Sequence, residues 1–253
     1  MAEAILALSG KGGVGKTTLA AASVRLLCEA HANARILAID ADPAIGLSTA
    51  LGVHVQTTLD DIRKAIVSDV ASGEKAQAIE LLNEARFRIF DTMVEDERFA
   101  FLAIGRPEAA GCYCAINSYL KEVITLLAND FDYVVIDGEA GIEQINRRVM
   151  EKVSHLLLVS DQSRKGLQVV QTIRRVAGEM VMYEHIGLVV NRVTHPDLLQ
   201  NSTPEAIPLL STIMQDPQYA ENDINGASIF TLPPDSPVLI GAAEALRKFQ
   251  LIP

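Results

Sequence analysis

The segment Ile5-Leu-Ala-Leu-Ser-Gly-Lys-Gly-Gly-Val-Gly-Lys-Thr-Thr18 decides the architecture of this chain. Its apolar start is typical of a short buried strand, and Gly10–Thr17 matches the phosphate-loop pattern G-x-x-x-x-G-K-[ST] between that strand and a predicted helix. Glycines let the backbone N–H groups close around phosphates, and the helix N-terminus adds partial positive charge. Lys16 should reach the β- and γ-phosphates, and the Thr17 hydroxyl should bind Mg²⁺. The segment therefore predicts a nucleotide site made of Gly12, Gly13, Val14, Gly15, Lys16, Thr17 and Thr18.

Short apolar runs alternate with helical patterns along the rest of the chain. Apolar strands without polar alternation are typical of a sheet covered on both faces. The sequence thus predicts an α/β fold with a doubly wound, mainly parallel sheet and helices on both faces. The expected strands are Ile5–Ser9, Arg35–Asp40, Phe99–Ile104, Tyr133–Asp137, His155–Ser160, Ile186–Asn191 and a short last one at Ser228–Leu232. Expected helices lie near Lys16–Ala30, Asn117–Ala128, Ser163–Gly178 and Val238–Phe249.

The length of 253 residues fits one P-loop ATPase domain over 1–253, with a polar, helix-prone insertion at about 55–98. The chain carries 22 basic and 32 acidic residues, a net charge of −10, which disfavours nucleic acid or an anionic membrane as the main partner. No apolar run approaches the roughly 18 residues of a membrane span. We therefore expect a cytoplasmic protein, whose thiols stay reduced.

Lys11 adds a second feature to the phosphate loop. The stretch Lys11-Gly-Gly-Val-Gly-Lys-Thr-Thr18 resembles the deviant Walker A motif of the MinD/ParA/nitrogenase-iron-protein class. In that class the early lysine crosses a dimer interface and touches the partner's nucleotide. The resemblance implies a homodimer in which Lys11 acts across the interface.

Two apolar strands end in carboxylates close to this loop. Ala38-Ile-Asp-Ala-Asp-Pro43 carries Asp40 and Asp42, and Tyr133–Asp137 ends in Asp137, which is the Walker B pattern. At such a strand end, one carboxylate can orient water while another holds the metal shell. The resemblance implies that Asp42 is the water-orienting residue of switch I. Asp40 and Asp137 are expected to hold Mg²⁺, directly or through water.

Three further segments extend the resemblance to this class. Gly138–Gly141 is typical of switch II, with glycines that allow the loop to move. Asn191 matches the class's adenine-contacting asparagine, which favours ATP. Leu232–Asp235, which includes Pro234, matches the loop that closes over the base.

Cys112 and Cys114 are two of only three cysteines in the chain. In a helix, residues two apart point about 200° apart, whereas in an extended stretch both sulfurs can reach one ion. Two thiolates do not complete a four-coordinate site, but a twofold axis would supply four. Four thiolates suit Zn²⁺, Ni²⁺ or an iron–sulfur cluster. Two buried free thiols are the alternative.

The residues around these cysteines resemble a more specific family. Gly105–Cys114 with Asn117, followed by Ile136–Glu143, is similar to the CooC family, nickel-insertion ATPases that mature carbon monoxide dehydrogenase. The resemblance covers nearly the whole chain. Many relatives carry His where this chain has Gln144, so a role for that His does not transfer.

The CooC resemblance implies an ATP-dependent metallochaperone with Mg²⁺ at the nucleotide. Ni²⁺, or Zn²⁺ in the same site, would be held by both cysteines of both protomers and passed to a client such as carbon monoxide dehydrogenase. Two alternatives stay open. One is an iron–sulfur cluster carrier or reductive ATPase with a cluster between subunits, and the other is a metal-independent MinD/ParA-like ATPase.

Overall fold

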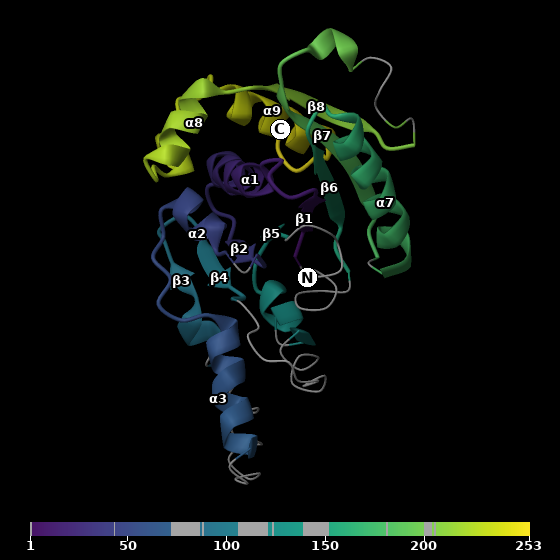
Figure 1. Ribbon diagram of the computed structural model, residues 1–253. Helices are drawn as coiled ribbons and strands as arrows, with labels where there is room; N and C mark the ends of the chain where they lie inside the picture. The colour runs from purple at the N-terminus through teal and green to yellow at the C-terminus, as the bar shows by residue number, and fades with distance from the viewer. Residues whose placement is uncertain are drawn as a thin grey trace.

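The computed structural model describes residues 2–42, 44–71, 87, 89–105, 121–122, 124–138, 152–180, 182–199, 204 and 206–253. In this part of the chain, eight strands form one sheet in the order β3-β4-β2-β5-β1-β6-β7-β8 (Figure 1). All neighbours are parallel except β3 and β4, which are antiparallel. The strands are β1 Ala4–Gly10, β2 Ile36–Asp40, β3 Val94–Glu95, β4 Ala100–Ala103, β5 Tyr133–Asp137, β6 His155–Ser160, β7 His185–Val193 and β8 Leu209–Met214.

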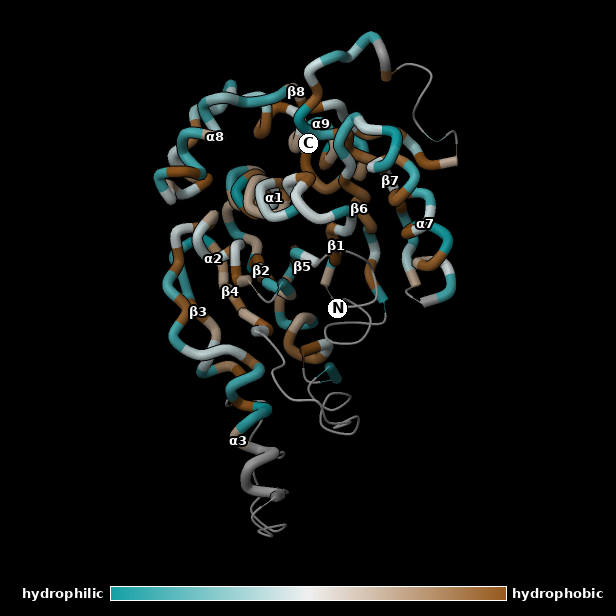
Figure 2. Tube along the Cα trace, in the orientation of Figure 1, coloured by the Kyte–Doolittle hydropathy of each residue, from teal (hydrophilic) through white to brown (hydrophobic). Residues whose placement is uncertain are grey.

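The central strands are buried on both faces because their side chains alternate between two apolar cores. In β6, for example, Leu156 and Leu158 enter one core cluster, whereas Leu157 and Val159 enter the other. Figure 2 shows these strands as mostly apolar. The doubly wound, mainly parallel α/β fold expected from the sequence is confirmed.

Helices cover both faces of the sheet. α1 packs against α9 and α2 on one face, and α7 packs against β6 and β1 on the other. In Figure 1, α3 projects away from the sheet. The helices are α1 Lys16–Ala30, α2 Gly46–Leu51, α3 Leu59–Ala71, α7 Arg164–Met180, α8 Pro217–Ile224 and α9 Pro237–Lys248, with 3₁₀ helices η1 Pro196–Leu198 and η2 Ile229–Thr231. Residues 121–122 and 124–128 are also helical.

The direction in which successive strands are added to the sheet reverses beside β1. From β1 the chain passes to β2 on one side of the sheet and later, from β5, to β6 on the other side. In open α/β sheets, ligands bind outside the carboxyl ends of the strands at such a switch point. The loop that follows β1 therefore lies where a nucleotide is expected.

The strand expected at Ser228–Leu232 is wrong. The segment contains η2 instead, and the Arg25 guanidinium donates hydrogen bonds of 2.7 Å to the carbonyls of Ile229 and Leu232. These carbonyls thus point to a side chain of α1 and not to a neighbouring strand. The last strand is β8, which the sequence reasoning missed.

The insertion expected at 55–98 falls partly on described residues. α3 lies in its first part and the two-residue strand β3 lies near its end. The division into one domain with this insertion stays a prediction. Within the ranges described above, no helix has the length and apolar character needed to cross a membrane.

Candidate functional site

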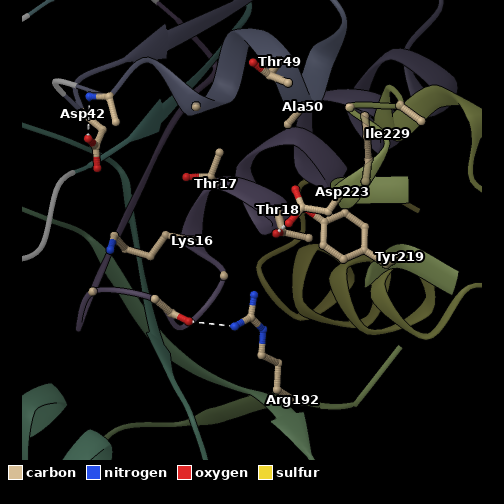
Figure 3. Close-up of a pocket in the computed structure, with 17 residues that line it drawn as sticks. Lys16, Thr17, Thr18, Asp42, Thr49, Ala50, Arg192, Tyr219, Asp223 and Ile229 are labelled. Carbon is tan, nitrogen blue, oxygen red and sulfur yellow. Dashed lines mark hydrogen bonds between the residues drawn. The ribbon is translucent and has the colours of Figure 1, made fainter. Parts of the chain in front are cut away.

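The phosphate loop lies at the carboxyl end of β1 and lines a cavity of about 850 Å³ (Figure 3). Gly15 caps α1 with a φ of 92°, and a Cβ at this position would lie 2.4 Å from the Asn191 amide nitrogen. Glycine is therefore required here by backbone conformation and by space. Of the residues predicted for this site, those lining the cavity are Gly12, Gly13, Gly15, Lys16, Thr17 and Thr18.

Lys16 is almost buried, with 7% of its surface exposed, and its ammonium donates a 3.3 Å hydrogen bond to the Lys11 carbonyl. The side chain thus folds back along its own loop. Figure 3 shows Lys16 and Thr17 beside the cavity. Val14 differs from the other loop residues because its side chain belongs to the core and its carbonyl accepts a hydrogen bond from the Asn191 amide.

Two carboxylates lie side by side at the ends of neighbouring strands. Asp40 of β2 and Asp137 of β5 are paired in register, and both are buried. Burial raises the pKa of Asp40 to about 7, helped by the charge of Asp137. Burial also raises the pKa of Asp137 to about 6, although Thr17 and Lys16 favour its charged form.

This pair fits a hard divalent cation. Within the described part of the chain, neither oxygen of Asp137 has a partner with hydrogen-bond geometry, although the Thr17 hydroxyl lies close enough to favour the charged carboxylate. Carboxylate and hydroxyl oxygens are the donors that Mg²⁺ prefers, and Thr17 supplies the hydroxyl beside Asp137. The sequence-predicted set of Thr17, Asp40 and Asp137 is thus brought together by the fold.

Asp40 also shapes the turn that carries Asp42. Its two oxygens accept hydrogen bonds from the backbone N–H groups of Asp42, at 3.0 Å, and Leu47, at 2.9 Å. Asp42 in turn accepts from the Ala44 N–H at 2.9 Å and lines the cavity. Any change at Asp40 is therefore transmitted through the backbone to the predicted water-orienting residue.

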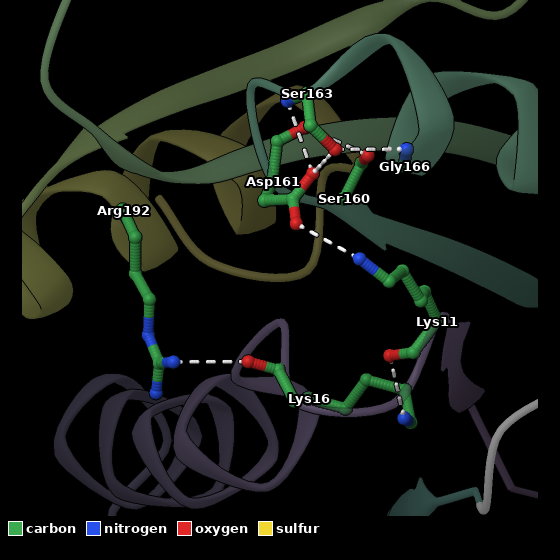
Figure 4. A network of polar contacts seen from close by, with 8 residues as sticks. Lys11, Lys16, Ser160, Asp161, Ser163, Gly166 and Arg192 are labelled. Carbon is green, nitrogen blue, oxygen red and sulfur yellow. Dashed lines mark hydrogen bonds and ion pairs between the residues drawn. The ribbon is translucent and has the colours of Figure 1, made fainter.

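Lys11 is bound within its own chain. Its ammonium lies 3.4 Å from the Asp161 carboxylate, which follows β6 (Figure 4). Partial burial opposes ionisation of Asp161, but hydrogen bonds from Ser163 and Lys11 outweigh it and lower its pKa. Both partners of the pair are about one third exposed, so the ion pair is weak and can be exchanged for another partner.

The last residues of β7 hold the phosphate loop from the other side. The Asn191 amide donates to the Val14 carbonyl at 2.9 Å, so this predicted adenine contact holds the loop backbone. Arg192 has a φ of 57°, in the left-handed region, and its guanidinium donates to the Gly13 carbonyl at 2.9 Å. Both loop carbonyls are therefore fixed by the end of one strand.

A second cavity of about 300 Å³ adjoins the first. Asn191 lines it together with Met214, which ends β8, and Gln215, which follows it. Tyr219 and Asp223 of α8 complete this part of the lining. The space is sized for the sugar or base of a nucleotide whose phosphates lie in the loop. Pro234, expected to close over the base, is exposed and is not among the described residues that line either cavity.

Sequence reasoning missed four residues of this region. Asp161 follows a buried strand, so the rule that found Asp42 and Asp137 could have found it. For the other three, Arg192, Tyr219 and Asp223, no motif was available.

Cys112 and Cys114 lie outside the described residues, as do residues 139–141 of the expected switch II. Among the residues whose placement is described, no group of three or more His, Cys, Asp or Glu side chains forms a metal cluster. The thiolate site thus stays a prediction.

Known proteins are similar to this chain over most of its length. Residues 5–229 match the CbiA family, described as the CobQ/CobB/MinD/ParA nucleotide binding domain. An uncharacterized ATP-binding protein of Methanocaldococcus jannaschii is 35% identical over 248 residues, covering 96% of this chain and 97% of that protein. The carbon monoxide dehydrogenase accessory protein CooC of Rhodospirillum rubrum is 28% identical over 218 residues, covering 77% and 81%.

A solved structure gives the same answer for the fold. The septum site-determining protein MinD of Pyrococcus horikoshii, complexed with Mg-ADP, superposes with a TM-score of 0.69. It covers 98% of this chain and 96% of its own, at 23% sequence identity. This likeness supports the fold and not the activity.

We predict that Asp137→Asn stabilises the protein in the absence of metal and nucleotide. The folded-state pKa of Asp137 lies above its usual value, so its charge opposes folding once the pH exceeds about 4 and does so fully above about 6. The free energy of unfolding should rise by about 1–3 kcal/mol at pH 8 and by much less at pH 4.5.

Chemical denaturation in EDTA at the two pH values measures this effect, with the exposed Asp235→Asn as control. A variant that is less stable than the parent at pH 8, or a gain independent of pH, would contradict the burial argument.

Proposed function

The chain belongs to the CobQ/CobB/MinD/ParA nucleotide-binding family and is a P-loop ATPase of the MinD/ParA type; we propose that it acts as a Mg²⁺-dependent homodimer that delivers nickel to a client metalloenzyme. The observation that supports the ATPase part is that Lys16, Thr17 and Asp42 line one cavity. Asp137 lies beside Thr17 and is paired in register with Asp40. Nickel delivery is supported by the C-x-C sequence and by the CooC relative.

In this proposal the phosphates of ATP lie in the loop between β1 and α1. Lys16 moves from the Lys11 carbonyl to the phosphates, where its charge stabilises the transferred group. Asp42 orients the attacking water. Mg²⁺, when bound at Thr17, Asp40 and Asp137, would neutralise charge on the β- and γ-phosphates.

Lys11 is the residue that we propose to act across the dimer. In the free chain it is paired with Asp161, so it must leave this partner before it can reach a second protomer. Because both side chains are partly exposed, breaking this ion pair costs little free energy. Nucleotide-dependent dimerisation would then depend on the release of Lys11.

Ligand count is the argument for the shared metal site. One chain offers Cys112 and Cys114, and two chains offer four thiolates about a twofold axis. Soft thiolates select Ni²⁺ or Zn²⁺ over Mg²⁺, so the cargo site is chemically separate from the nucleotide site. The same four thiolates also suit an iron–sulfur cluster, which is the second candidate function.

We predict different defects for the two loop lysines. Lys16→Ala should abolish nucleotide binding, because it removes the charge that faces the phosphates. Lys11→Ala should bind ATP as the parent does but hydrolyse it about a hundredfold more slowly, because a transition-state charge is lost. Equilibrium binding and phosphate release measure both, and parental turnover in Lys11→Ala would disprove its role across the dimer.

Asp42→Asn is expected to trap an ATP-bound dimer. The amide keeps the shape of the side chain but lacks the charge that orients water, so hydrolysis should fall by at least about a hundredfold. Gel filtration with ATP should show a persistent dimer while phosphate release is lost. If hydrolysis is unchanged, the role passes to Asp40.

The shared site predicts one Ni²⁺ or Zn²⁺ per dimer. Anaerobic titration of metal into the wild type and into Cys112→Ser/Cys114→Ser, each with and without a non-hydrolysable ATP analogue, measures stoichiometry and affinity. Nucleotide should change metal affinity, typically by roughly 1–3 kcal/mol, and metal should change nucleotide affinity equally.

Cys28→Ser is the matched control, because Cys28 donates to the Arg98 carbonyl at 3.4 Å and lies on α1. One metal per monomer, or tight binding without Cys112 and Cys114, would exclude the shared site. Iron and sulfide in the purified protein would favour the cluster carrier.

A further inference from the structure

The outer side of α7 carries four exposed cationic side chains, which we call the basic face: Arg164, Lys165, Arg174 and Arg175. The opposite side of the helix belongs to one of the two apolar cores. Figure 1 shows α7 along the outside of the molecule, and Figure 2 shows that hydrophilic and hydrophobic residues alternate along it. The side that points away from the sheet is therefore charged and open to solvent.

The cations of the basic face differ from the other basic residues that the structure describes. Outside α7, each described Lys or Arg makes a hydrogen bond, an ion pair or another electrostatic contact. Arg35 pairs with Asp132, for example, and Lys152 pairs with Glu184. Among the described residues, no such contact is found for any member of the basic face, although the whole chain has a net charge of −10.

The stability of α7 does not explain these charges. Arg164 and Lys165 lie in its first turn, where the helix dipole disfavours cations and favours anions. The last turn contains no basic residue, so the dipole does not reach Arg174 and Arg175 either. Glu179 is the acidic residue of this helix, and no ion pair joins it to Arg175, four residues earlier. The basic face is thus free to bind an external anion.

The spacing of the polar side chains makes the centre of the basic face linear. Arg164, Gln168, Gln171 and Arg175 follow the pattern i, i+4, i+7, i+11, which places them in one stripe along a helix. The two arginines are about 16 Å apart along the axis, because an α-helix rises about 1.5 Å per residue. Glutamine side chains both donate and accept hydrogen bonds. The stripe therefore matches a second helix that carries carboxylates at the same spacing.

The composition of α7 distinguishes between the anionic partners that a basic helix can have. A helix that lies on a membrane needs apolar side chains to enter the lipid, and no exposed side chain among the described residues of α7 is apolar. Nucleic acid would bring many phosphates close to a chain whose net charge is −10. An acidic protein segment meets the basic face with fewer negative charges and at a fixed spacing.

We propose that the basic face docks an acidic helix of a partner protein. Carboxylates of that helix pair with Arg164 and Arg175, each of which offers two parallel N–H groups to a carboxylate. Gln168 and Gln171 form hydrogen bonds with the polar side chains between them. This inference goes beyond the proposed function, because it depends neither on ATP hydrolysis nor on the cysteines.

The test measures binding of two alanine-based helical peptides by fluorescence anisotropy. The spaced peptide carries four glutamates in the pattern i, i+4, i+7, i+11, and the consecutive peptide carries the same four glutamates side by side, which spreads them around the helix. The wild type should bind the spaced peptide more tightly. Arg164→Gln/Arg175→Gln should weaken that binding by about tenfold, and high salt should weaken it in the wild type. Arg164→Glu/Arg175→Glu should instead prefer a spaced peptide with lysines.

Arg35→Gln/Lys152→Gln is the matched control, because it changes the net charge equally but removes cations that are already paired with Asp132 and Glu184. It should keep the wild-type affinity, and the unfolding midpoints of all variants should match the parent. Equal wild-type affinities for the spaced and consecutive peptides, or an equal loss in the two glutamine variants, would overturn the proposal. Tighter binding of duplex DNA or of phosphatidylserine vesicles than of the spaced peptide would overturn it as well.

Discussion

The site depends on two carboxylates that the parallel sheet forces into the same buried place. Because Asp40 and Asp137 end neighbouring strands in register, their charges lie close together with almost no solvent around them. Burial raises the pKa of both carboxyl groups, and the charge of Asp137 raises that of Asp40 further, so the buried pair favours a proton or a cation. A cation at this edge would relieve the repulsion and, through the Asp40 bonds to the backbone of Asp42 and Leu47, act directly on the turn that carries Asp42.

The phosphate loop is held by groups that a nucleotide would displace or reorient. Lys16 is bonded to a loop carbonyl, Lys11 to Asp161, and Thr18 to Tyr219. The Lys11 and Thr18 contacts join the loop to other parts of the site, and all three contacts use a group that we expect to face ATP or a second protomer. Nucleotide binding would therefore change contacts along the carboxyl edge of the sheet. This coupling is what a switch between monomer and dimer requires.

Local sequence patterns were sufficient to predict those parts of the site that depend on residues close together in the chain. The glycine pattern placed the phosphate loop, and apolar runs ending in aspartate placed Asp42 and Asp137 at the correct edge. The segment at 228–232 was mispredicted because Arg25, two hundred residues away, binds its carbonyls. Tyr219 and Asp223 could not be found for a similar reason, since they reach the site only through the packing of α8 after β8.

The central claim is that a working site combines Asp42 of one protomer with Lys11 of the other. Lys11→Ala and Asp42→Asn should each be inactive alone, yet both should bind ATP. In an equimolar mixture, every mixed dimer contains one site with both residues, so about a quarter of the wild-type hydrolysis rate should return if pairing is random. A mixture that stays as inactive as its two components, although mixed dimers are present by native mass spectrometry, would contradict the shared catalytic site.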